Sequence, residues 1–233
     1  YVTPLEGDRL IAAALWVDRE AYPGRPLFNG DTEGCLPMAV LVADSEDLGN
    51  TWSPWRAVSV PEDVGPPSLT SPVLRLRGGR LAISIETNKP SEDRSRWYPR
   101  VVYVYSEDGG KTWGAPATVA QDPEARFFNW DQRAGVTPDG RVVTFTWYYD
   151  RETTTYLNVR RRVSRDEGAT WSAPEDLGFA DQASHPAMLP DGRVVLAWVD
   201  RYGTRSIRAR LAEGVDAPFP AETEVVLYEY QGQ

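Results

Sequence analysis

The sequence is poor in the residues from which proteins build covalent and metal-bound cross-links. It holds one cysteine, Cys35, and one histidine, His185. An intrachain disulfide is therefore excluded, and a zinc site of the Cys/His type would need a second chain. We expect neither a metal nor a cofactor. No apolar run approaches the roughly 20 residues of a membrane-spanning helix, so membrane insertion is not expected.

Positive charge is also in deficit. The 25 Lys and Arg residues face 34 Asp and Glu residues, which gives a formal net charge of -9. Such a surface repels polyanions, and this argues against nucleic acid as a partner. A local basic pocket is compatible with this negative net charge. The composition does not indicate a cellular compartment.

Turn-forming and aromatic residues are abundant. The chain has 19 Gly and 19 Pro beside nine Trp and 11 Tyr, and 41% of its residues are hydrophobic. Gly and Pro interrupt helices and form tight turns, whereas aromatic side chains suit the pleated surface of a sheet. The composition predicts an all-β protein with a substantial core.

An octapeptide with the pattern Ser-x-Asp-x-Gly-x-Thr-Trp occurs three times, at residues 45–52, 106–113 and 164–171. The Asp carboxylate can accept backbone N–H bonds inside a tight turn, and the Gly can take a left-handed conformation. We therefore interpret Asp47, Asp108 and Asp166 as residues that build the fold, with the Trp packed against its own sheet.

A second repeat alternates with the first. A turn followed by an apolar strand begins at Gly7, Gly78, Asp139 and Asp191, and Asp-Gly between strands is a strong hairpin signal. Together the two repeats predict four modules of four strands each. Their approximate bounds are 1–60, 61–120, 121–178 and 179–233.

The second module shows the predicted strands best. They cover 71–76, 80–85 and 100–105, with a fourth near 118–119. The first module is longer than the others between its second and third strands, which identifies an inserted loop at 18–37.

These octapeptides resemble the Asp-box, or BNR, repeats of the sialidase superfamily. The resemblance covers nearly the whole chain and implies a β-propeller of four-stranded antiparallel blades. It also implies a secreted or cell-surface protein. The family propeller usually has six blades, whereas about 58 residues per module give four here. An open arc of four blades would expose strand edges, so we expect a portion of a larger propeller or closure with another copy of the chain in a homo-oligomer, with a self-contained four-bladed ring as a third, less favoured alternative. The start at Tyr1 without an initiator Met indicates a processed or cropped chain.

Candidate site residues lie at the starts of the innermost strands and after the second strands, because loops at that end of a propeller surround its axis. The segment 129–133 offers Trp130, Asp131 and Arg133 within five residues, and His185 has the equivalent place in the fourth module. An aromatic ring with charged groups suits sugar binding. The candidates that follow second strands are Glu86, Tyr148, Asp200, Arg201 and Tyr202.

The family resemblance implies roles for some of these residues. Arg133 matches an arginine that clamps the substrate carboxylate, and Asp31 resembles the family's acid/base Asp. With Asp131, His185 and Tyr202, Asp31 completes the candidate catalytic set. The candidate substrate-binding set consists of Trp130, Arg133, Glu86, Tyr148, Asp200 and Arg201.

Two functions follow from the sequence and remain alternatives. One is a sialidase-like glycoside hydrolase acting on terminal, acidic sugars. The other is a noncatalytic propeller that binds a glycan or a protein, which is favoured by the absence of the family's Arg-Ile-Pro tripeptide. For any single Asp-Arg pair after the second strands, a solvated or structural pair without a functional role is the favoured interpretation.

Overall fold

The computed structural model describes residues 1–180 and 182–232. Strand accounts for 44% of the chain. Within the described residues, helix is confined to three short 3-10 turns, η1 (Glu62–Val64), η2 (Arg77–Gly79) and η3 (Ala221–Thr223). The predicted all-β class is confirmed.

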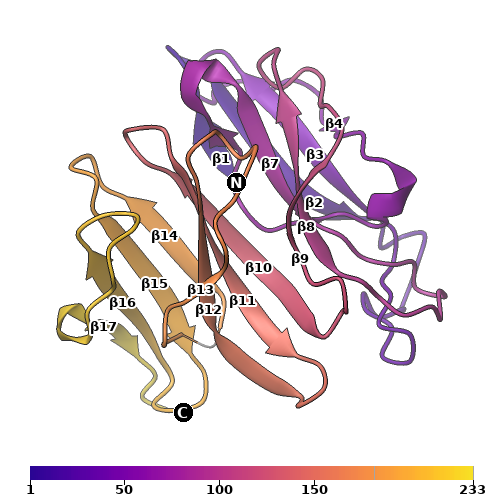
Figure 1. Ribbon diagram of the computed structural model, residues 1–233. Helices are drawn as coiled ribbons and strands as arrows, with labels where there is room; N and C mark the ends of the chain where they lie inside the picture. The colour runs from indigo at the N-terminus through magenta and orange to yellow at the C-terminus, as the bar shows by residue number, and fades with distance from the viewer. Residues whose placement is uncertain (181, 233) are drawn as a thin grey trace. The chain divides into compact units, whose positions relative to one another are not determined.

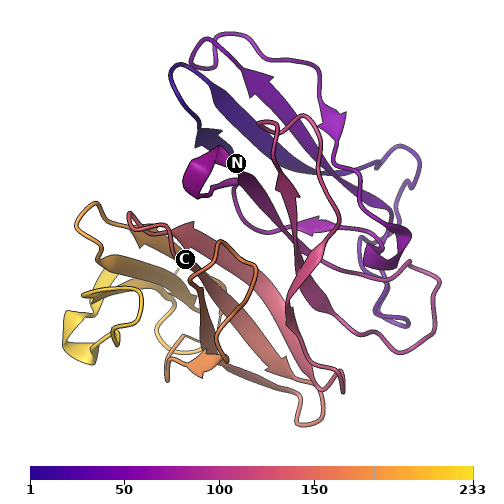
Figure 2. The same ribbon diagram turned by 45° about the horizontal axis from the view of Figure 1, so that its top comes forward.

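Two compact units, Tyr1–Ala125 and Arg126–Gln233, divide the chain. Each unit contains two antiparallel sheets, and within each sheet the strands follow one another in sequence order (Figures 1 and 2). Four such up-and-down sheets are the blades that the sequence repeats predict.

The first unit holds the first two sheets. The first sheet has the order β1-β2-β3-β4, and the second has β5-β7-β8-β9 with β6 also paired to β7. Their bounds are β1 (Val2–Pro4), β2 (Leu10–Val17), β3 (Met38–Ser45), β4 (Arg56–Ala57), β5 (Ser68–Leu69), β6 (Leu74–Arg75), β7 (Leu81–Glu86), β8 (Arg100–Ser106) and β9 (Ala117–Gln121).

The second unit holds the third and fourth sheets, in the orders β10-β11-β12-β13 and β14-β15-β16-β17. Their bounds are β10 (Phe127–Val136), β11 (Val142–Asp150), β12 (Thr155–Ser164), β13 (Glu175–Asp176), β14 (Ser184–Met188), β15 (Val194–Asp200), β16 (Ser206–Ala212) and β17 (Val225–Glu229).

One predicted strand differs from the structure. The continuous first strand expected at 71–76 is instead two short pieces, β5 and β6, which both pair with β7. Pro72 lies between the two pieces, and proline cannot donate a hydrogen bond to a sheet ladder. The inserted loop at 18–37 is present as predicted, between β2 and β3.

The order of the strands gives every sheet two distinct ends. We call the end with the first-to-second and third-to-fourth connections the hairpin end, and the end with the second-to-third connection the loop end. Because neighbouring strands are antiparallel, the octapeptides all occupy hairpin ends. The candidate residues after the second strands occupy loop ends.

The three octapeptides form the same hydrogen-bonded turn. In the third, Asp166 Oδ1 accepts a bond of 2.8 Å from the Thr170 amide and another of 2.8 Å from the Ser164 hydroxyl. The Gly168 amide donates to Ser164 Oγ at 2.7 Å. The same bonds recur around Asp47 and Asp108. These carboxylates therefore stabilise the turns of the fold.

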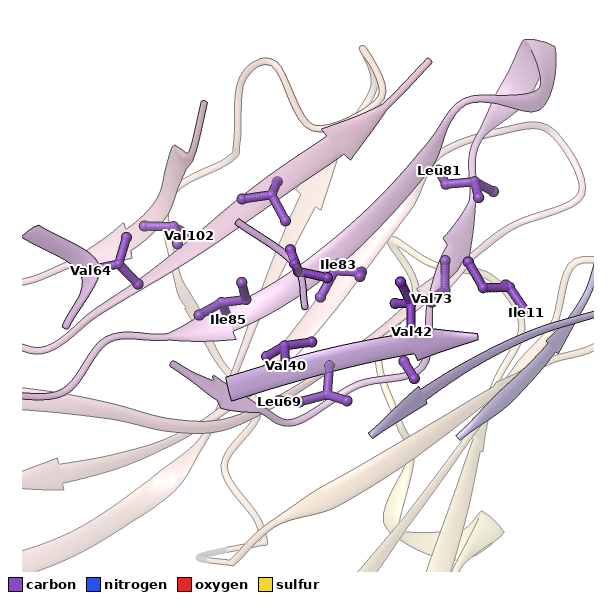
Figure 3. Close-up of a cluster of buried hydrophobic side chains, with 13 residues drawn as sticks. Ile11, Val40, Val42, Val64, Leu69, Val73, Leu81, Ile83, Ile85 and Val102 are labelled. Atoms are coloured by element: carbon purple, nitrogen blue, oxygen red, sulfur yellow. The ribbon is translucent and has the colours of Figure 1, made fainter. Parts of the chain in front are cut away.

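Each unit has its own hydrophobic core, formed where strand alternation turns apolar side chains toward the neighbouring sheet. In the first unit, Val40 and Val42 of β3 pack with Ile83 and Ile85 of β7, and all four are almost fully buried (Figure 3). In the second unit, Phe145 lies in the corresponding cluster, whose other buried members include Val143, Val163, Leu196, Trp198 and Phe219.

Candidate functional site

A bulge in β10 positions the segment that the sequence singles out. Trp130 pairs with Trp147 and Arg133 pairs with Phe145, so three residue steps on β10 oppose two on β11. Asp131 within the bulge has a φ of 47°, a left-handed conformation that Asp tolerates better than most residues. Bulges redirect side chains at functional sites, and this one sits on the first strand of its sheet, at the sheet edge.

Asp131 and Arg133 contact each other at this bulge. Arg133 Nη2 donates to Asp131 Oδ1 at 3.3 Å, and the Arg133 side chain is only 18% exposed. Its second terminal nitrogen, Nη1, is buried and has no hydrogen-bond partner among the described residues. A buried guanidinium nitrogen without a partner is costly, which makes Arg133 suited to an anionic ligand.

His185 lies near this pair. It belongs to β14, which packs beside β10 within the second unit. Desolvation, followed by the positive charge of Arg133, lowers the pKa of His185 below its ordinary value of 6.5. The imidazole is therefore mainly neutral at pH 7 and can accept a proton or a hydrogen bond.

The connection between β15 and β16 carries three further candidates. Asp200 Oδ1 accepts the amides of Tyr202 and Gly203 at 3.2 and 3.1 Å, and Oδ2 lies 3.6 Å from Arg208. Asp200 therefore shapes the turn. Arg201 is exposed and lines a cavity of about 440 Å³ on this part of the fourth sheet.

Tyr202 is the candidate from this connection that reaches the third sheet. Its ring is 61% exposed and stacks on Tyr156 with centroids 6.1 Å apart. Its hydroxyl lies 3.5 Å from Gln182 Nε2. Gln182 precedes β14, the strand that carries His185.

An aromatic row extends from the bulge to Tyr202. We give this name to Trp130, Trp147, Tyr149, Tyr156 and Tyr202. Trp130 stacks on Tyr149 with centroids 5.5 Å apart, Trp147 stacks on Tyr156 at 5.0 Å, and Tyr149 lies 4.9 Å from Tyr156. The Trp147 Nε1 donor is buried without a partner among the described residues. The row presents ring faces of the kind on which sugars stack.

The row was only partly found from the sequence. Trp147, Tyr149 and Tyr156 were missed, although the alternation of Phe145, Trp147 and Tyr149 along β11 places all three on one face. The neighbouring candidate Tyr148 belongs to the opposite face. It is buried at 7% exposure and contacts Phe127 and Arg160 instead.

Two candidates belong to the first unit. Asp31 is exposed in the 18–37 loop, where its amide donates to Asn29 Oδ1 at 3.0 Å. Glu86 ends β7, is partly buried and pairs with Ser68 across the sheet. The structure therefore brings Trp130, Asp131, Arg133, His185 and Tyr202 together in the second unit, and it places Asp31 and Glu86 in the first.

The 18–37 loop is fastened to the connection between β7 and β8. The Cys35 amide donates to the Lys89 carbonyl at 2.9 Å, and Asn29 Nδ2 donates to the Ser91 carbonyl at 2.9 Å. The Cys35 thiol is buried, which raises its pKa to about 11. A thiol with so high a pKa is a poor nucleophile at neutral pH, as expected for an inert cysteine.

Among the residues that the structure describes, no cluster of three or more His, Cys, Asp or Glu side chains could hold a metal ion. The same residues include no helix long and apolar enough to cross a membrane.

No family model and no curated protein matches the sequence. Solved structures do match the fold. A protein of unknown function from Dyadobacter fermentans aligns over 100% of this chain and 65% of its own, with a TM-score of 0.74 and 23% identity. A Hadza microbial sialidase aligns over 95% of this chain and 46% of its own, with a TM-score of 0.64 and 16% identity.

An α-L-arabinanase from Penicillium chrysogenum, solved with arabinobiose, aligns over 97% of this chain and 65% of its own, with a TM-score of 0.62 and 20% identity. The chain thus has the β-propeller fold found in sialidases and in an arabinanase, and the predicted fold class is confirmed. It spans between 46% and 65% of the length of these three structures.

Proposed function

We propose that this protein is a sialidase-like glycoside hydrolase that acts on terminal, acidic sugars of glycans, through the loop end of the second unit. The observation that carries the proposal is the buried, unpartnered Nη1 of Arg133 beside the aromatic row. A guanidinium binds a sugar carboxylate through two parallel bonds, and neighbouring rings stack on the sugar face.

The surrounding groups have separate roles in this proposal. Asp131, which contacts Arg133, orients that arginine and is proposed to exchange a proton with the glycosidic oxygen. His185, kept mainly neutral at pH 7 by its lowered pKa, accepts a proton or a hydrogen bond. Tyr202 provides an exposed ring and a hydroxyl at the rim. Asp31 and Glu86 lie in the first unit and are not assigned to this site.

A panel of chromogenic glycosides that includes sialosides, uronosides and neutral arabinosides tests this function directly. Arg133→Gln should abolish turnover of the acidic substrates. Arg193→Gln is the matched control, because Arg193 lies at the hairpin end of the fourth sheet and pairs with Asp191 at 2.8 Å. Turnover confined to neutral substrates, or unchanged in Arg133→Gln, would contradict an acidic substrate.

Noncatalytic glycan binding is the second candidate, and one observation favours it. Asp131 Oδ1 already accepts a hydrogen bond from Arg133 Nη2 at 3.3 Å. This ion pair favours the charged carboxylate, whereas a general acid must keep its carboxyl group protonated. Calorimetry with sialic and glucuronic acids separates the two functions. Binding that Arg133→Gln weakens by about 10-fold to 100-fold, with no glycoside turned over, would favour a binding protein.

A further inference from the structure

The first unit contains a polar cavity that none of the site candidates accounts for. It has a volume of about 340 Å³ and lies at the loop end of the second sheet, around the connection from β7 to β8. Its charged and aromatic lining residues are Asp63, Lys89, Arg96, Trp97, Tyr98 and Arg100. Three cationic side chains thus face one carboxylate, in a chain whose net charge is -9.

Lys89 is the most buried of the three cations. It is only 7% exposed, and its ammonium group donates to the carbonyl of Ser95. An ammonium has three N–H donors, yet within the described residues no carboxylate forms an ion pair with this one. Asp93 is near enough for Lys89 to contribute to the lowering of its pKa, but its main partner is Ser95. Buried charges in proteins are normally paired.

Arg96 is the second cation without a carboxylate partner among the described residues. Its Nη2 donates to the Glu124 carbonyl at 2.6 Å, and its guanidinium lies 5.7 Å from the centre of the Tyr98 ring. Arg100, the third, already pairs with Asp63. The charges of Asp63 and Arg100 therefore offset each other, and Lys89 and Arg96 give the cavity an excess of positive charge.

We propose that this cavity binds the anionic group, a carboxylate or a sulfate, of a single sugar residue. Its volume of about 340 Å³ is at the small end of the range for ligand pockets, roughly 300 to 1,000 Å³. Tyr98, which is 48% exposed, offers a ring face for the sugar. We infer an anionic ligand from the positive charge of the cavity. That this anion is attached to a sugar rests on the proposed function.

The test is a calorimetric titration with glucuronate, inorganic sulfate and glucose. It uses protein that carries Arg133→Gln, so that the candidate site of the second unit does not contribute. Arg96→Gln removes an exposed cation of the cavity without disturbing the core. Arg94→Gln is the matched control, because Arg94 is exposed on the same connection and does not line the cavity. Lys89→Met removes the buried cation, with circular dichroism to verify folding.

We expect saturable binding of glucuronate and no binding of glucose. Arg96→Gln should weaken glucuronate binding about 10-fold, as loss of a charge-assisted bond does, and Arg94→Gln should change it less than about twofold. Equal affinities in Arg96→Gln and Arg94→Gln, or no binding of any anion, would overturn the proposal. Binding of inorganic sulfate without glucuronate would support the anion site and overturn a sugar carboxylate as its ligand. Glycosidase activity is measured in protein that keeps Arg133, so the function of the second unit is tested separately from these outcomes.

Discussion

The ring of Tyr202 stacks on the ring of Tyr156 although the two residues belong to different sheets. Their centroids are 6.1 Å apart and their planes are inclined by 27°. Tyr156 is 39% exposed and Tyr202 is 61% exposed. Through this contact the aromatic row extends from the third sheet to the fourth. The ring of Tyr202, at the end of the row, stays accessible to a ligand.

Tyr202 therefore gives a direct test of the row. Tyr202→Ala should weaken glycan binding by about 5-fold to 10-fold, because it removes one ring face of about 1 kcal/mol. Tyr202→Phe keeps the ring and should retain most of the affinity. Since the side chain is mostly exposed, thermal unfolding should change little in either variant. Identical losses in the Ala and Phe variants would show that the hydroxyl, and not the ring, makes the contact.

Gly34 is expected to be indispensable for fastening the 18–37 loop. A Cβ atom at this position would lie 2.2 Å from the carbonyl oxygen of Pro90, whereas one at Gly30, in the same loop, would meet nothing within 4 Å. Gly34→Ala should therefore cost about 2 to 3 kcal/mol of unfolding free energy, as overpacking does, and Gly30→Ala should cost less than about 0.5 kcal/mol. Urea denaturation followed by Trp fluorescence measures both, and equal midpoints would contradict the close approach.

The octapeptide tryptophans should contribute unequally to stability. Trp113 is partly buried and packs against the core of the first unit, whereas Trp52 is 40% exposed. We expect Trp113→Ala to cost about 2 kcal/mol, below the usual range for a fully buried aromatic, and Trp52→Ala to cost less. A larger loss at Trp52 in chemical denaturation would reverse this ranking.

The octapeptide carboxylates should make the protein sensitive to acid. The hydroxyl and amide of Thr51 and the hydroxyl of Ser45 lower the pKa of Asp47 from 3.8 to about 2. A lowered pKa in the folded state contributes stability that is present above the unfolded value of 3.8 and is lost as pH falls toward about 2. Asp47→Asn should therefore flatten the fall of the urea midpoint between about pH 4 and pH 2. Glu46→Gln, an exposed neighbour, should leave that profile unchanged.

The sequence predicted the repeating features of this fold because they are local. Each octapeptide closes its turn with bonds between residues two to four positions apart, such as Ser106 to Asp108 and Thr112 to Asp108. The predicted strands 80–85 and 100–105 match β7 and β8 to within one residue for the same reason. Alternation of apolar residues and turn chemistry are visible in a single sequence.

The candidate site was predicted less completely, because it depends on register. The β10 bulge between Trp130 and Arg133 has no sequence marker, yet it decides where Asp131 points. Tyr148 and Trp147 are adjacent in sequence, but strand alternation turns Trp147 into the row and Tyr148 to the opposite face. The contact between Tyr156 and Tyr202 depends on the packing of two sheets, which no local pattern encodes.

The single histidine allows a last prediction about the charges at the site. Desolvation and the positive charge of Arg133 lower the pKa of His185 below 6.5, so its imidazole resonances, unique in the NMR spectrum of this chain, should titrate below that value. Arg133→Gln removes the charge and should raise the pKa toward 6.5, while Arg193→Gln should not. Because the unfolded chain binds this proton more readily, His185 should reduce stability as pH falls below about 6.5. A pKa of His185 at or above 6.5 in the wild type, or a pKa that Arg133→Gln leaves unchanged, would show that Arg133 does not act on His185. The imidazole would then not belong to the proposed site.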